Sequence, residues 1–145
     1  MPLLAGQRLK AGQLDRLRPR RYSAVGTSTV AGPLTNGDIP GCTITLTTET
    51  ANAEYHIIGV FDIRATLGSA GTATGRAAID GAMQSPLATF NAPDASGRNT
   101  VAQQWTGTIP TAGSHTIKLV ATLTNSTQEA VGVNSSVVVI IQEVV

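Results

Sequence analysis

Aromatic residues, charges and cysteines are all scarce in this chain of 145 residues. Aromatic residues account for 3% of it and charged residues for 13%, whereas Ala, Val, Ile, Thr and Gly are abundant. Because small and β-branched side chains fit a pleated surface, this composition favours β-sheets. The single cysteine, Cys42, excludes an intrachain disulfide framework. Its position at the start of an expected strand indicates a small, buried side chain.

Residue patterns that support catalysis or metal binding are missing as well. Ser114 and His115 are adjacent on an expected strand, so they point to opposite faces and cannot form a nucleophile–base pair. His56 shares a strand face with Glu54, but no third ligand follows at a metal-binding spacing. We therefore predict that the protein is not an enzyme and has no catalytic residues, no cofactor and no metal site.

Long apolar runs are absent from the sequence. No stretch approaches the ~18–20 apolar residues that a membrane-spanning helix requires, and the N-terminal MPLLAGQRLK lacks the apolar core of a secretory signal. We expect a protein that is made in a cytoplasm and has no membrane partner.

The positive charge is concentrated at the N-terminus. Residues 1–21 hold one acid, Asp15, and six basic side chains, namely Arg8, Lys10, Arg16, Arg18, Arg20 and Arg21. Leu9, Leu14 and Leu17 form the apolar stripe of a short helix predicted over Lys10–Leu17, which Pro19 would end. Isolated helices of this length are marginal in water, so we expect residues 1–21 to act as a docking arm that becomes ordered against a partner.

The arginines of the arm also raise the question of nucleic-acid binding. The rest of the chain offers no basic patch and no clustered aromatic residues for base stacking. Leucine interleaved with arginine better suits an acidic, grooved protein surface. We predict a protein partner and no specific nucleic acid.

The remainder of the chain divides into a linker and a β-rich body. Residues 22–41 are rich in Ser, Thr, Gly, Pro and Asn, which predicts a linker with a turn at Asn36-Gly37. From residue 42 to residue 145 the apolar period is two, and turn residues recur at hairpin spacing, including Asp80-Gly81. With seven or eight expected strands and no helix between them, the pattern predicts an all-β fold, an antiparallel β-sandwich of the jelly-roll type.

Two of the expected strands have more apolar surface than one small sandwich can cover. Residues 54–67 are apolar on both faces, and residues 137–141 form an uninterrupted apolar run. Soluble monomers seldom expose such patches, so we expect the body to associate with identical copies. The candidate interface residues are Ile58, Val60, Val137, Val139 and Ile141.

Two stretches of the sequence resemble known proteins. QWTGTIPTAGSHTIKL at residues 104–119, with AIDG at 78–81 before it and a hydrophobic strand at the end, resembles small virion proteins of actinobacterial phages. LAGQRLKAGQLDRL at residues 4–17 resembles the N-terminal attachment segment of phage fibre and appendage proteins. That segment usually has Thr-Ala and Leu-Asn where this chain has Lys10-Ala11 and Leu14-Asp15.

The resemblance implies a trimeric jelly-roll body of the tumour-necrosis-factor and C1q type. It implies a homotrimer on the virion surface whose arm attaches to the particle and whose knob faces outward, and it implies no catalytic residues. The short linker leaves no shaft between arm and knob, which favours a capsid decoration or head-fibre protein bound to the major capsid protein. A minor tail protein, in a tail fibre or tail tip and bound to another tail protein, is the alternative.

A function of a different class is a receptor- or carbohydrate-binding module. It would use a loop such as residues 91–97 to bind a host cell-surface glycan. Exposed aromatic side chains would support this alternative, but most of the aromatic residues fall within expected strands.

Overall fold

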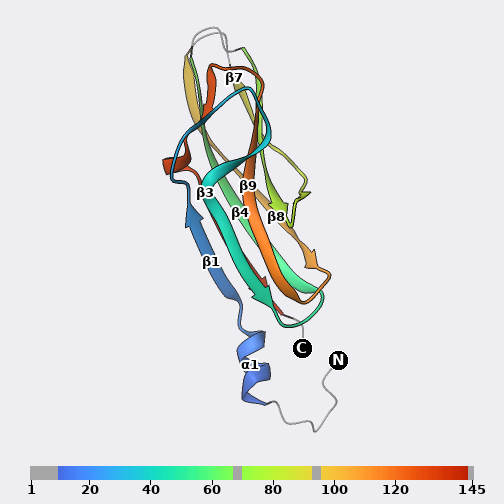
Figure 1. The fold of residues 1–145 in the computed structure, drawn as a ribbon. Helices are drawn as coiled ribbons and strands as arrows, with labels where there is room; N and C mark the ends of the chain where they lie inside the picture. Colours follow the sequence, from blue (N-terminus) through green and yellow to red (C-terminus); the bar gives the residue numbers. More distant parts are fainter. Residues whose placement is uncertain (1–9, 67–69, 93–95, 144–145) are drawn as a thin grey trace.

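The computed structural model describes residues 10–66, 70–92 and 96–143, which form one short helix followed by an elongated β-sandwich (Figure 1). The elements, in chain order, are α1 (Ala11–Leu17), β1 (Arg20–Val25), β2 (Val30–Ala31), β3 (Leu34–Thr48), β4 (Ala53–Ala65), β5 (Gly71–Ile79), β6 (Ala82–Met83), β7 (Ala88–Ala92), β8 (Gly97–Ile109), β9 (Gly113–Leu123), β10 (Gln128–Ala130), the 3₁₀ helix η1 (Gly132–Asn134) and β11 (Ser136–Gln142). Among these residues no helix is long and apolar enough to cross a membrane.

The strands form two antiparallel sheets. Sheet I has the order β1-β11-β4-β10-β2, and β8 pairs with β4 along its whole length. Sheet II has the order β3-β9-β5-β6, and β7 also pairs with β5. Because strands adjacent in the sequence lie mostly in opposite sheets, the chain crosses repeatedly between the two layers. The predicted all-β jelly-roll sandwich is confirmed.

The hydrophobic core lies between the two sheets, and β4 contributes much of it. Its inward-facing residues Tyr55, Ile57, Phe61 and Ile63 are each no more than 9% exposed. The Phe61 ring meets Trp105 of β8 edge-on, with ring centroids 6.4 Å apart. Full burial of each large apolar side chain contributes about 1.5–3 kcal/mol. Such contacts hold the two layers together.

The hairpin predicted at Asp80-Gly81 is present. Both residues have positive φ, 50° and 85° respectively, as a type I′ turn requires. The turn joins β5 to β6, and Ala78 pairs with Met83 across it.

The interpretation of residues 22–41 as a linker is wrong. These residues include most of β1, all of β2 and the first part of β3. Tyr22 and Ala24 of β1 point inward and pack against the core. β1 also pairs with β11 over six residue pairs. Asn36 and Gly37 lie at a register shift within β3, so the residues expected to form a turn instead bend a long strand.

The described chain after β9 does not end in one continuous strand. It contains β10, η1 and β11. Gly132 and Gly26 lie so close that a side chain on either would strike the backbone of the other segment. This close approach requires glycine, and β10 and β11 run in the same direction along β4 on either side of η1.

For three of the five candidate interface residues, the face of the strand predicted from the sequence is wrong. Val137, Val139 and Ile141 have no exposed surface and lie within the core of their own subunit. The register places Val139 opposite Ile57 and Val138 opposite Ile58, so Val138 and Ile140 point outward instead. The candidate surface therefore consists of Ile58 and Val60 together with Val138 and Ile140.

Cys42 is fully buried, as predicted, and burial raises the pKa of its thiol to about 11. We expect no reaction with a disulfide reagent at pH 8 in the folded protein, because the thiolate is the reactive form and the reagent cannot reach it. Absorbance of the released thiolate would measure this. Denaturant supplies the control, since the unfolded chain should react at one thiol per molecule; rapid reaction without denaturant would contradict the prediction.

Candidate docking site

Helix α1 projects from one end of the sandwich, beyond the start of β1 (Figure 1). The predicted helix is thus present, and none of its residues is buried. The backbone N–H of Lys10 donates to Oε1 of Gln13 at 2.9 Å, which closes the first turn, and the helix ends just before Pro19. Leu14 is 50% exposed and Leu17 is 37% exposed, so two apolar side chains three residues apart are open to a partner.

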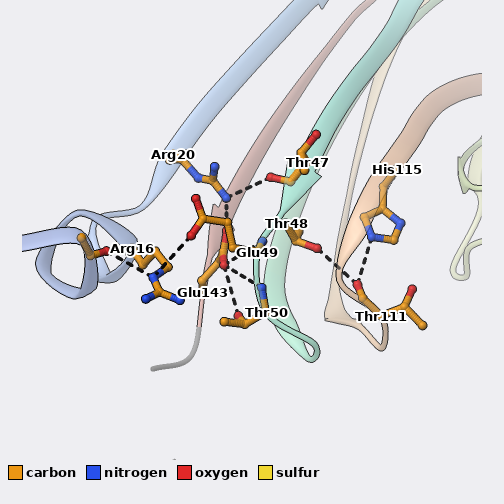
Figure 2. Close-up of polar contacts among 10 residues, drawn as sticks. Arg16, Arg20, Thr47, Thr48, Glu49, Thr50, Thr111, His115 and Glu143 are labelled. Carbon is orange, nitrogen blue, oxygen red and sulfur yellow. Dashed lines mark hydrogen bonds and ion pairs between the residues drawn. The ribbon is translucent and has the colours of Figure 1, made fainter.

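A buried carboxylate holds the chain where the arm joins the body (Figure 2). The side chain of Glu143, only 1% exposed, forms an ion pair with Arg20 through Oε1. Its Oε2 accepts from the backbone N–H groups of Glu49 and Thr50, both at 3.0 Å, and from the Thr50 hydroxyl at 3.2 Å. Arg20 also donates to the carbonyl of Thr47 at 3.1 Å. We call these five residues the Glu143 socket.

The socket joins three segments that are distant in sequence. Arg20 begins β1, residues 47–50 cover the end of β3 and the turn after it, and Glu143 follows β11. A buried carboxylate destabilises a fold unless its charge and lone pairs are satisfied. Here one guanidinium and three further donors satisfy it, so the socket fixes where the arm leaves the body.

The sequence reasoning missed Glu143, although a signal was available. Period-two alternation from Val137 through Ile141 places residue 143 on the inward face. A single acid at an inward position after an apolar strand indicates a buried carboxylate that needs a partner. The sequence did not reveal that Glu143 pairs with Arg20, a residue predicted to contact a docking partner.

The arm cations divide into those bound to the body and those left exposed. Arg16 lies 3.5 Å from the carboxylate of Glu49, a surface pair worth at most about 1 kcal/mol. Arg16 and Arg20 are thus held by their own chain. Lys10, Arg18 and Arg21 are exposed and have no ion pair within the described residues. Arg8 and Leu9 lie outside the described residues.

A second polar cluster lies near the socket and involves His115, which is buried. Its Nδ1 lies 2.7 Å from Asp80, and its Nε2 lies 3.0 Å from the carbonyl of Thr111. The Thr48 hydroxyl donates to the same carbonyl (Figure 2). Burial raises the pKa of Asp80, but hydrogen bonds from His115 and from the Thr116 N–H outweigh it, and the pKa is lowered overall. Since both ring nitrogens face acceptors, His115 is held as a structural link between two turns.

The other histidine, His56, lies on the outer face of β4. Its Nε2 is 3.0 Å from the side-chain oxygen of Gln104 on β8. Among the described residues, no three His, Cys, Asp or Glu side chains lie together in a way that could hold a metal ion.

The outer face of sheet I is apolar at its centre, and the described part of the chain does not cover it. Ile58, Val60, Val138 and Ile140 are half-buried there, and Val25 of β1 is 58% exposed beside them. The outer face of sheet II differs, because threonines occupy it on β3, β5 and β9, for example Thr45, Thr74 and Thr116. An apolar face on one sheet only is typical of a surface that another protein covers.

The aromatic side chains do not form an exposed binding platform. Tyr55, Phe61, Phe90 and Trp105 are buried, and Tyr22 packs partly buried against the core. The indole N–H of Trp105 donates to the carbonyl of Pro86 at 2.8 Å, so its polar group is used internally. Residues 93–95 of the loop considered for glycan binding lie outside the described residues.

Solved structures similar to this chain share its fold at low sequence identity. The globular domain of zebrafish complement 1qA has a TM-score of 0.50 and 11% identity, with 86% of this chain and 97% of that chain covered. Murine APRIL has a TM-score of 0.50 and 6% identity, with 87% and 100% covered. The CBM36-1 domain of a multidomain xylanase from the hindgut metagenome of Trinervitermes trinervoides has a TM-score of 0.44 and 15% identity, with 87% and 100% covered.

At these identities the similarity establishes the fold alone. The expected likeness of the body to C1q and tumour-necrosis-factor-type sandwiches is confirmed at that level. No protein-family model matches the chain, and neither does any curated protein sequence. The resemblance to virion proteins of actinobacterial phages stays a prediction.

Proposed function

We propose that this protein is a non-enzymatic structural protein of a bacteriophage particle, a homotrimeric knob docked on the virion surface through its N-terminal arm. The observation that carries the proposal is α1, a short helix that projects from the body with Leu14 and Leu17 exposed. An exposed amphipathic helix is a common means of docking into a groove on another protein.

The junction of the arm with the body is held in place, and this supports a docking role. Binding costs free energy for ordering a flexible segment, and a segment already held in place avoids part of that cost. The Glu143 socket holds β1, and the Arg16–Glu49 ion pair connects α1 to the same end of the body. The complementary surface would have an apolar floor for the leucines and acidic residues near Lys10 and Arg18.

The outer face of sheet I supports self-association. Ile58, Val60, Val138 and Ile140 form an apolar centre that a monomer would leave in water. Covering this face with identical copies related by a threefold axis would bury it and would place every α1 at the same end of the assembly. A trimer of this kind would present three arms to a threefold-symmetric site.

The distance between arm and body favours the capsid over the tail. β1 begins at Arg20, directly after α1 ends at Leu17, so the described chain has no room for a shaft between helix and sandwich. We propose capsid decoration or a head fibre bound to the major capsid protein. A minor tail protein remains the alternative within the same class.

Leu14→Asp is expected to weaken binding to the particle by about ten- to a hundredfold, because burying one leucine contributes about 1.5–3 kcal/mol. The melting temperature of the body should not change, since Leu14 is exposed and belongs neither to the core nor to the residues packed against it. Cosedimentation with particles stripped of the protein measures the binding.

Leu87→Asp is the matched control. Leu87 is 37% exposed, like Leu17, but it belongs to the body rather than to the arm. This variant should bind particles as the wild type does. Unimpaired binding of Leu14→Asp, or an equal loss with Leu87→Asp, would remove the arm as the docking element.

A further inference from the structure

Most of the charged residues on the outer face of sheet I are paired within the chain. Arg98 of β8 forms an ion pair with Asp62, and Arg64 of β4 forms one with Glu129. The Arg98 guanidinium, which approaches Asp62 at 2.9 Å through Nε, and the amide of Asn134 hold the pKa of Asp62 below its usual value despite burial. These four charged residues are therefore already satisfied.

Two charges on this face remain, Arg21 of β1 and Glu54 of β4. Both side chains are exposed, and neither has an ion pair among the described residues. The alternation of β1 turns Tyr22 and Ala24 inward, so Arg21 points outward with Ser23 and Val25. Glu54 precedes Tyr55, which is buried, and so points to the same outer face.

The register explains why the two charges do not meet within one chain. Arg21 lies opposite Ile140, which in turn lies opposite His56, whereas Glu54 lies opposite Gln142. Arg21 and Glu54 are therefore separated by the width of β11 and by two residues along β4. Adjacent strands are about 4.8 Å apart, so roughly 10 Å separates β1 from β4. The outward side chain of Ile140 lies between them.

We propose that another copy of this chain covers the outer face of sheet I, and that Arg21 of each copy pairs there with Glu54 of its neighbour. The inference rests on the self-association in the proposed function and adds the contact that sets its register. The face contains both a cation and an anion, unpaired and on different strands, so in a closed trimer each copy can offer Arg21 to one neighbour and Glu54 to the other. Charge complementarity of this kind selects the partner and its orientation more than it raises affinity.

The apolar centre and the two charges have separate roles in this interface. The apolar centre consists of Ile58, Val60, Val138 and Ile140. Hydrophobic attraction is non-directional, so this surface alone would allow a neighbouring copy to bind in many orientations. A single Arg–Glu contact next to this surface lowers the free energy of one orientation relative to the others. In any other orientation, an unpaired charge would lie against an apolar part of the neighbouring copy.

The test is a charge swap. Arg21→Glu and Glu54→Arg should each weaken self-association roughly tenfold or more, since each places like charges together. The double variant, Arg21→Glu with Glu54→Arg, restores opposite charges and should recover most of the wild-type association. Light scattering over a range of concentrations measures the mass, and circular dichroism checks that each variant is folded.

The control is Arg76→Glu on β5, which changes the net charge as Arg21→Glu does but lies on the outer face of sheet II. It should leave the association unchanged. A trimeric wild type whose single variants associate normally, or a double variant that does not recover, would overturn the Arg21–Glu54 contact alone. A wild type that is monomeric at all concentrations would overturn both this contact and the proposed trimer.

Discussion

Val139→Lys is expected to prevent the subunit from folding. Val139 has no exposed surface, and the register places it between Tyr22 of β1 and Ile57 of β4. An ammonium group buried there would have no partner, which costs several kcal/mol in addition to the lost burial of valine. A domain of this size has only about 5–15 kcal/mol of stability, so the variant should be recovered insoluble or without a cooperative thermal transition.

Its neighbour provides the matched control. Val138 is the adjacent residue on the same strand, but it lies half-buried on the outer face of sheet I. Val138→Lys should fold with nearly the wild-type melting temperature and should fail to self-associate. If both variants unfolded, or if Val138→Lys associated normally, the assignment of the two faces of β11 would be wrong.

Glu143→Ala is expected to lower the free energy of unfolding by about 2–4 kcal/mol, because it removes a buried charge partner and leaves buried donors unsatisfied. The donors that lose their acceptor are Arg20, the Thr50 hydroxyl and the N–H groups of Glu49 and Thr50. Denaturant unfolding measures the loss. Hydrogen exchange should also accelerate at residues 18–22 and 47–50, where the socket holds the chain.

Two further variants separate the socket from the surface contact beside it. Glu143→Gln keeps one acceptor oxygen and should fall between the wild type and Glu143→Ala. Glu49→Ala removes the exposed ion pair with Arg16, with an effect within about 1 kcal/mol. An equally small loss in Glu143→Ala would mean that the socket does not fix the arm.

The sequence pattern predicts the fold wherever large apolar residues alternate with polar ones. In β3, Cys42, Ile44 and Leu46 alternate with threonines, and these three side chains are buried. In β9, the buried residues Ile117 and Leu119 alternate with Thr116 and Lys118. These strands were predicted because burial of one face imposes a period of two.

The same pattern fails where the inward side chains are small or the composition is polar. β1 places only Tyr22 and Ala24 against the core, too weak a signal among the surrounding Ser, Thr and Gly. β11 fails for the opposite reason, because every residue over 137–141 is apolar and the sequence alone does not show which of them face inward. Pairing with β4 decides this, and pairing is a long-range property.

The candidate site was only partly predictable for a related reason. The exposed leucines of α1 follow from their spacing, since local sequence determines a helix. The ion pair between Arg20 and Glu143 joins residues 123 positions apart, so composition and spacing could not reveal it. The arm thus presents fewer free cations to a partner than its sequence indicates.

The connection of α1 to β1 determines how the molecule would bear a mechanical load. A pull on the helix away from the sandwich is directed along β1 (Figure 1), which is bonded to β11 over six antiparallel residue pairs. Hydrogen bonds in such a ladder lie perpendicular to the strands, so this force shears them all together and does not peel them apart one by one. The Arg20–Glu143 ion pair shares that load. An anchor built in this way resists detachment by tension better than a hairpin pulled from its open end.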